Sequence, residues 1–165
     1  MLVDVLLSKI SKSTMYSLLT VLIVLMNTLI LYPRPVLSLF YKLLFFDIAF
    51  DTDFDLEFYM NFGRLDGSGA DGIVFVLQRA SNTSLGSSGG GIGYQGLTPS
   101  LGIEFDTWYN SNVNDPSYDH MSIFKNGVMD HASSSCLTST VAASATSINI
   151  EDGAEHLVRV QWNSG

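Results

Sequence analysis

The stretch FDLEFYMNF, residues 54–62, alternates between apolar and polar side chains at every step. This period of two predicts a β-strand with one buried and one solvated face. HLVRVQW, residues 156–162, alternates in the same way, whereas GIVFVLQ, residues 72–78, is apolar on both faces and indicates a central strand. LGIEFDTW, residues 101–108, and HMSIFK, residues 120–125, are two further predicted strands.

No long segment after residue 50 has the period of a helix. The short strands are separated by loops rich in Gly, Asn, Asp and Ser, and the pair Asn126-Gly127 is typical of a hairpin turn. This succession predicts an all-β fold in which antiparallel sheets form a sandwich.

The first 46 residues differ from the rest in composition. They hold four basic residues and one acid and are dominated by Leu, Val, Ile, Met and Phe. Residues 16–32 form an apolar run of about the length of a minimal membrane span, roughly 17 to 25 residues. We therefore expect a helical signal anchor or a long signal peptide, with membrane anchoring through residues 16–46 and an extracellular or cell-surface location; a mis-started gene end is the alternative.

Residues 47–165 form the second predicted unit, and their charge limits its partners. They hold four basic residues and fifteen acids, which is a net charge of −11. Binding to nucleic acid requires clustered Lys and Arg, so nucleic acid is excluded as a partner. Cations are the expected partners of this portion.

The acids of residues 101–125 are spaced for such cations. Residues two apart share one face of a strand, so Glu104 and Asp106 point in the same direction, which is unfavourable unless a cation or a proton joins them. Asn110 and Asp115 follow in a loop that can fold back on the strand end, and His120 opens the next strand. Oxygen donors suit Ca²⁺, and carboxylates with one imidazole suit a transition ion such as Mn²⁺.

The segment EFDTWYN followed by NDPSYDH resembles the metal-binding motif of the L-type (legume-type) lectins. This resemblance implies a concanavalin A-like jelly-roll sandwich that binds glycans or glycoproteins without enzymatic activity. It implies transition-metal ligation by Glu104, Asp106, Asp115 and His120, and Ca²⁺ ligation by Asp106, the Trp108 carbonyl, Asn110 and Asp115.

Two further segments resemble the same family. ADGIVFVL resembles its strand entry with a cis peptide, here between Ala70 and Asp71, and GGGIG resembles its glycine loop, which places a backbone N–H donor at Gly90 with Gly91 as the alternative. The sugar-binding residues implied in this way are Asp71, Gly90, Trp108 and Asn110. Trp108 would stack its ring on the apolar face of the sugar.

Three alternatives concern activity and completeness. β-Glucanases share the sandwich, but their pattern has a further Glu two residues after the Asp, where this chain has Trp108. The resemblance covers only residues 54–162, less than the family's domain, so we expect an incomplete sandwich with an open edge, and an inactive partial module is the third alternative. The sequence does not distinguish a glucose/mannose-type site from a galactose-type site. It also does not determine the oligomeric state.

Overall fold

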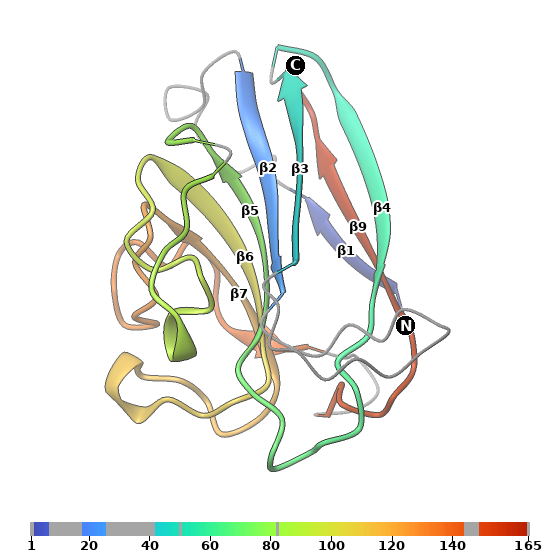
Figure 1. Cartoon of the computed structure of the whole chain (residues 1–165), viewed down its shortest axis with the longest axis vertical. Coiled ribbons are helices and arrows are strands. Elements are labelled where there is room, and N and C mark those ends of the chain that lie inside the picture. The colour runs from blue at the N-terminus through green and yellow to red at the C-terminus, as the bar shows by residue number, and fades with distance from the viewer. Residues whose placement is uncertain are drawn as a thin grey trace.

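The structure is a computed structural model. It describes residues 51–164 except residues 82 and 144–148, and the backbone of residues 2–6, 18–25 and 42–49. Two β-sheets face each other (Figure 1), and the described residues contain no α-helix. The strands are β1 Leu2–Leu6, β2 Leu18–Leu25, β3 Lys42–Ala49, β4 Phe54–Met60, β5 Gly72–Gln78, β6 Ser100–Asp106, β7 His120–Lys125, β8 Val141–Ala142 and β9 His156–Trp162, and the short 3-10 helices are η2 Gly89–Gly91 and η3 Ser111–Val113.

The larger sheet has six strands in the order β3-β2-β5-β6-β7-β8, and every neighbouring pair in it is antiparallel. The smaller sheet has the order β1-β9-β4. In it β4 and β9 are antiparallel, but β1 runs parallel to β9, which the predicted all-antiparallel sandwich did not include. The all-β prediction is confirmed.

The burial of the strands follows their periodicity. Along β9, Val158, Val160 and Trp162 are buried, and the residues between them are half-buried. All of β5 is buried, as its apolar character on both faces predicts. At the turn after β7, Asn126 and Gly127 have φ values of 57° and 68°, which fit the hairpin turn predicted there.

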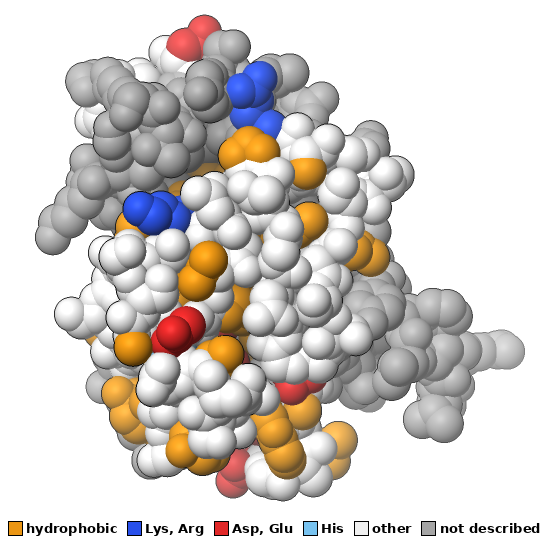
Figure 2. Space-filling model, turned by 90° about the vertical axis from the view of Figure 1, so that its left-hand side faces the viewer, with side chains coloured by type: hydrophobic (Ala, Val, Ile, Leu, Met, Phe, Trp, Pro, Cys, Tyr) orange, Lys and Arg blue, Asp and Glu red, His pale blue; other side chains and the backbone are white. Residues whose placement is uncertain are grey.

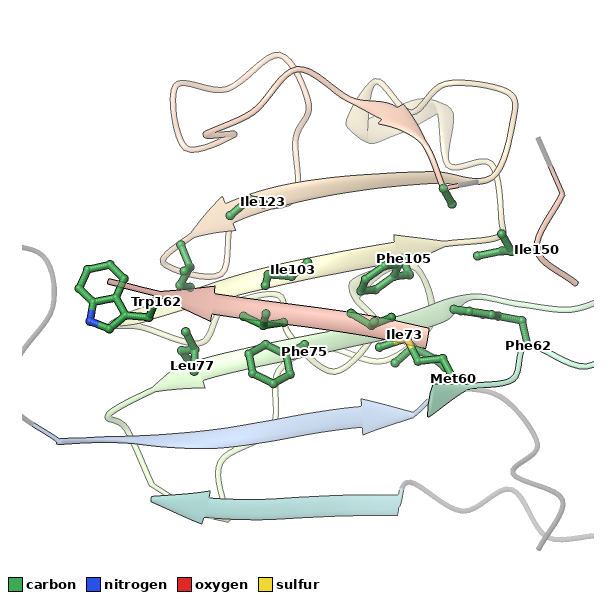
Figure 3. Close-up of a cluster of buried hydrophobic side chains, with 14 residues drawn as sticks. Met60, Phe62, Ile73, Phe75, Leu77, Ile103, Phe105, Ile123, Ile150 and Trp162 are labelled. Carbon is green, nitrogen blue, oxygen red and sulfur yellow. The ribbon is translucent and has the colours of Figure 1, made fainter. Parts of the chain in front are cut away.

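The main core lies between the two sheets. Figure 3 shows side chains from β5 and β6 facing β9, with Trp162 at one end and Phe62 and Ile150 at the other. A second apolar cluster lies on the opposite face of the larger sheet, under the loops that come after β5 and β7. Its members are Val74, Val76, Ile92, Tyr94, Leu97, Phe124 and Met129.

The buried Tyr94 attaches the glycine-rich loop to the larger sheet. Its hydroxyl donates to the carbonyl of Phe124, 3.1 Å away, and accepts from the N–H of Gly127 at 3.1 Å. Gly102 on β6 allows this close approach, because a Cβ there would lie 2.8 Å from the Tyr94 ring. The loops on this face are therefore held at fixed positions over β6 and β7.

The helix predicted within residues 16–32 is wrong for the part that the structure describes. Leu18–Leu25 is strand β2, which pairs with β3 on one side and with β5 on the other. A short apolar run fits a buried strand as well as a buried helix, and here the open edge of β5 supplies the pairing partner. Thus β2 and β3 extend the larger sheet beyond β5.

Among the described residues, no helix combines the length and the apolar character needed to cross a membrane. Residues 42–46 of the predicted anchor belong to strand β3. Residues 16–17 and 26–41 lie outside the described residues, so anchoring through them stays a prediction.

Candidate metal centre

The apolar side chains and the acids of strand β6 lie on opposite faces of the larger sheet. Ile103 and Phe105 belong to the core between the sheets, while Glu104 and Asp106 belong to the opposite face, as the period of a strand requires. Antiparallel pairing places His120 of β7 directly beside Asp106. The exposed fractions of Glu104, Asp106 and His120 are 2%, 1% and 1%, so three of the predicted metal ligands share one buried region.

The loop between β6 and β7 folds back on the strand end, as predicted. Its Asp115 side chain is 1% exposed, and its carboxylate Oδ2 accepts the backbone N–H of Asn110 at 2.7 Å. The N–H of Trp108 donates to Asp106 Oδ1 at 2.6 Å. These two bonds hold the loop against the end of β6, with the Asp115 carboxylate turned inward.

The ligand atoms of four predicted residues and one further histidine converge there. Asp106, Asp115 and His120 place one ligand atom each within 4.8 Å of the others, and so do Glu104, His120 and His131. His131 was not among the ligands predicted from the sequence. One feature could have indicated it: the turn at residues 126–127 reverses the chain, so the residues after it return beside β7.

Burial decides the protonation of these groups. Burial raises the pKa of Glu104 well above its usual value, and the nearby Asp106 and Asp115 carboxylates raise it further. Burial likewise raises the pKa of Asp106 to about 8, although the N–H of Trp108 opposes the rise. For His120, burial lowers the pKa to about 4, so its ring is neutral at pH 7 and its contact with Glu104 is not an ion pair.

Two buried oxygens of the cluster lack hydrogen-bond partners. They are Glu104 Oε2 and Asp115 Oδ1. An unpartnered buried carboxylate oxygen is costly, and a divalent cation removes the cost by accepting its lone pair. The donor set of carboxylates and neutral imidazole therefore fits a divalent metal ion.

The raised pKa of Asp106 predicts metal binding that strengthens with pH. Ligands must be ionised to coordinate, and Asp106, with a pKa of about 8, is mostly protonated at about pH 6. We expect ionisation of Asp106 to raise the affinity for a divalent ion by up to about tenfold per pH unit between about pH 6 and 8, whereas His120, already neutral, contributes nothing to this slope.

Calorimetric titration in buffers of different ionisation enthalpy measures this proton release. Asp106→Asn should reduce the number of protons released, and pH-independent binding would contradict the assignment.

In the metal-free chain, the pH dependence of folding stability has the opposite sign to that of metal affinity. A carboxyl whose folded-state pKa is raised binds its proton more tightly in the folded state, so stability should fall as the pH rises from about 4 to 8.

Asp71 lies next to this cluster. The peptide bond between Ala70 and Asp71 is cis, as expected. The Asp71 carbonyl accepts the N–H of Thr107 at 3.0 Å, and burial raises the pKa of its carboxyl. The next residue must be glycine: Gly72 has a φ of 145°, and a Cβ there would lie 2.3 Å from the carbonyl oxygen of Phe105.

The glycine-rich loop brings one of its two candidate donors to Asn110. A Cβ at Gly90 would lie 2.7 Å from Asn110 Oδ1, whereas one at Gly91 would meet Ser87 and Gln95. The N–H of Gly91 donates within the loop to the Ser88 carbonyl, 3.3 Å away. Of the two candidates, Gly90 therefore adjoins the other predicted site residues.

Aromatic side chains at the loop edge are exposed. Trp108 is 41% exposed, Tyr109 57% and Tyr118 38%, so Trp108 is not a core residue. The carbonyl of Trp108 accepts the side-chain N–H of Asn110 at 3.2 Å. Figure 2 shows one side of the molecule, where hydrophobic side chains lie among backbone and other uncoloured groups and few Asp or Glu side chains are exposed.

Comparison with known proteins identifies the fold family. The model of the legume lectin β-barrel domain matches residues 44–165, which is most of the chain. The chain belongs to the L-type (legume) lectin family. A protein described as a galactose-binding lectin from Arachis hypogaea is 42% identical over 64 residues. That match covers 36% of this chain and only 23% of the length of the Arachis lectin.

Membership in this family implies a concanavalin A-like sandwich, which agrees with the two facing sheets. L-type lectins typically bind Ca²⁺ and Mn²⁺, and the described residues include two groups of acids and histidines whose ligand atoms lie close together. His131 was not part of the motif that suggested this family.

Proposed function

We propose that this L-type lectin chain binds carbohydrate at a site that two metal ions organise. The observation that carries the proposal is the position of Asp106. Asp106 belongs to the buried cluster of potential metal ligands. In the β5–β6 pair it lies opposite Gly72, and Gly72 is the residue that follows Asp71. The metal centre and the predicted sugar ligands are therefore parts of one structure.

In this proposal the two ions share ligands. Glu104, Asp106, Asp115 and His120 hold the transition metal, whereas the Ca²⁺ ligands are Asp106, the carbonyl of Trp108, Asn110 and Asp115. Support comes from the bond between the Asn110 N–H and Asp115, which holds the loop that both sets require. The ions perform no chemistry; they preorganise the loop and lower the ordering cost of binding.

Three groups form hydrogen bonds with the sugar hydroxyls. The Asp71 carboxylate accepts hydrogen bonds from two hydroxyls, and the Asn110 amide and the Gly90 N–H donate to them. The contact between Gly90 and Asn110 and the proximity of Asp71 to Asp106 support this set. The exposed Trp108 ring stacks on the apolar face of the pyranose.

Galactose is the first sugar that we propose. This choice rests on the match with the Arachis protein described as a galactose-binding lectin, and the glucose/mannose type is its alternative. Glycoproteins display their glycans outside cells, so we also propose an extracellular or cell-surface location.

The burial of the acids argues against a glycosidase. A retaining glycosidase places two carboxyl groups about 5 to 5.5 Å apart on either side of the scissile bond, where the polysaccharide reaches both. Glu104 and Asp106 are 2% and 1% exposed, and the loop after β6 covers them. These carboxylates are suited to metal ligation and are inaccessible to a sugar chain.

Retention of the chain on immobilised galactose tests the proposal. In the presence of Ca²⁺ and a transition metal, we expect retention and its release by free galactose. Release by mannose or glucose but not galactose would replace the proposed sugar, and no retention on any glycan of an array would contradict lectin function. Product release from a labelled polysaccharide would show the enzyme alternative instead.

A further inference from the structure

His131 lies against the buried acids and the histidine of the metal centre. Its Nε2 atom lies 3.0 Å from Asp115 Oδ1, 3.5 Å from Glu104 Oε2 and 3.2 Å from His120 Nε2. The two carboxylate oxygens are the buried ones without hydrogen-bond partners. Three potential ligand atoms thus lie within 3.5 Å of His131 Nε2, and the ligand atoms of Glu104, His120 and His131 all lie within 4.8 Å of one another.

The other nitrogen of each histidine ring is directed away from these ligand atoms. His120 Nδ1 lies 3.1 Å from the carbonyl of Tyr118, which can only accept, so this nitrogen carries the proton and leaves the lone pair on Nε2. His131 Nδ1 lies 2.8 Å from the hydroxyl of Thr140 and 3.3 Å from that of Ser122. Such outer partners are typical of metal-binding histidines.

Hydrogen bonding within the metal-free protein does not satisfy all four atoms. At most one proton lies between the facing Nε2 atoms of His120 and His131, and neither carboxylate oxygen is a hydrogen-bond acceptor in this arrangement. A divalent cation in place of that proton would accept lone pairs from both rings and from Glu104, whose ligand atoms converge within 4.8 Å.

The His131 ring is held in place by its surroundings. Its side chain is 5% exposed and makes an edge contact with Phe124, with ring centroids 5.0 Å apart. Its backbone N–H donates to the carbonyl of Val113, 2.9 Å away, in the loop that carries Asp115. Binding a cation therefore requires little reordering of this side chain.

We infer that His131 is a direct ligand of the transition-metal ion, and that this second imidazole widens the preference of the centre for Zn²⁺ over Mn²⁺. The inference rests on the metal centre of the proposed function and specifies which ion it takes. Carboxylate and water ligands suit Mn²⁺, whereas each added imidazole favours the later first-row ions, which already bind more tightly in the general order of divalent metals.

Metal competition on the Ca²⁺-loaded chain tests the inference. We expect Zn²⁺ to displace Mn²⁺ from the wild type, and His131→Ala to weaken Zn²⁺ binding by at least about 100-fold, above the 10- to 100-fold loss typical of outer partners. Mn²⁺ affinity should fall by only about tenfold or less. Thr140→Val should cost Zn²⁺ affinity roughly tenfold, because Thr140 only orients the ring.

His156→Asn is the matched control, since His156 is a buried histidine in the other sheet that bonds to Ile150 and Asp152. The metal affinities of the His156→Asn variant should equal those of the wild type. Equal Zn²⁺ affinity in His131→Ala and the wild type would overturn the inference.

X-ray absorption spectroscopy of the Zn²⁺-loaded wild-type chain needs no variant and so does not depend on variant folding. Two imidazole ligands support the inference, and one imidazole overturns it. Glycan binding measured in the same samples separates the two proposals. Two imidazoles without glycan binding refute only the lectin function, and glycan binding with one imidazole refutes only the role of His131.

Discussion

Removal of divalent cations with EDTA is expected to abolish glycan binding by this chain. Without a cation, the carboxyl groups of Glu104, Asp106 and Asp115 are buried close together, and two of their oxygens have no hydrogen-bond partner. The loop that carries Asn110 is held through Asp115, so disorder at the centre reaches the sugar site. Glycan-array signal before and after chelation, and after return of the ions, measures the effect.

Stability should respond in the same experiment. A ligand present at about 1,000 times its dissociation constant stabilises the folded state by about 4 kcal/mol, so chelation should lower the unfolding midpoint clearly. Unchanged array signal after complete chelation, verified by elemental analysis, would exclude metal-dependent sugar binding.

The variant Asp115→Asn should reproduce the effect of chelation while the ions are present. An amide oxygen can still accept the N–H of Asn110, which Asp115 Oδ2 accepts at 2.7 Å, so the loop keeps this bond and loses only a charge. Asp55→Asn is the matched control, because Asp55 is an exposed carboxylate of β4 that pairs with Arg159 in the smaller sheet. We expect the control to bind metal and glycan normally.

The second large effect is expected from Asp71→Asn, which should separate sugar binding from metal binding. The substitution keeps the size of the side chain and the backbone carbonyl that accepts from Thr107. It removes the charged acceptor, and hydrogen bonds to charged groups are worth about 1.5 to 3 kcal/mol each. Sugar affinity should fall roughly 100-fold or more, as measured by calorimetry with galactose.

Metal affinity is the discriminating measurement for this variant. Asp71 belongs to neither group of converging ligand atoms, so Zn²⁺, Mn²⁺ and Ca²⁺ should bind Asp71→Asn within about tenfold of the wild type. Asp66→Asn, an exposed acid of the preceding loop, serves as control and should leave both activities intact. A variant at Asp71 that keeps sugar affinity, or that loses its metals, would contradict the role proposed for this carboxylate.

Local pattern predicted the strands whose two faces have different environments. Along β4 and β9 the alternation matches burial residue by residue, because one face contacts the core and the other contacts solvent. Leu18–Leu25 has apolar side chains at nearly every position, so its sequence has no period that separates strand from helix. Pairing with β5 decided the outcome, and that pairing joins residues far apart in the chain.

The metal-site residues also divide into those that local spacing predicted and one that only long-range contacts bring to the site. Glu104, Asp106, Asp115 and His120 lie within one strand, one loop and the start of the next strand, so their convergence results from spacing along a single hairpin. His131 comes from the segment after the next turn. It reaches the centre because the chain reverses at residues 126–127, and because Val113, Thr140 and Phe124 hold its backbone and ring.

The sequence by itself determined the all-β class, the central strands and the acid-rich hairpin, since each depends on side chains close together in the chain. Only the tertiary structure decided that β2 completes the edge of β5, that Gly90 contacts Asn110 and that a second histidine joins the cluster. These three outcomes depend on contacts between separate segments. Packing and backbone pairing in the folded chain set such contacts, and no local period encodes them.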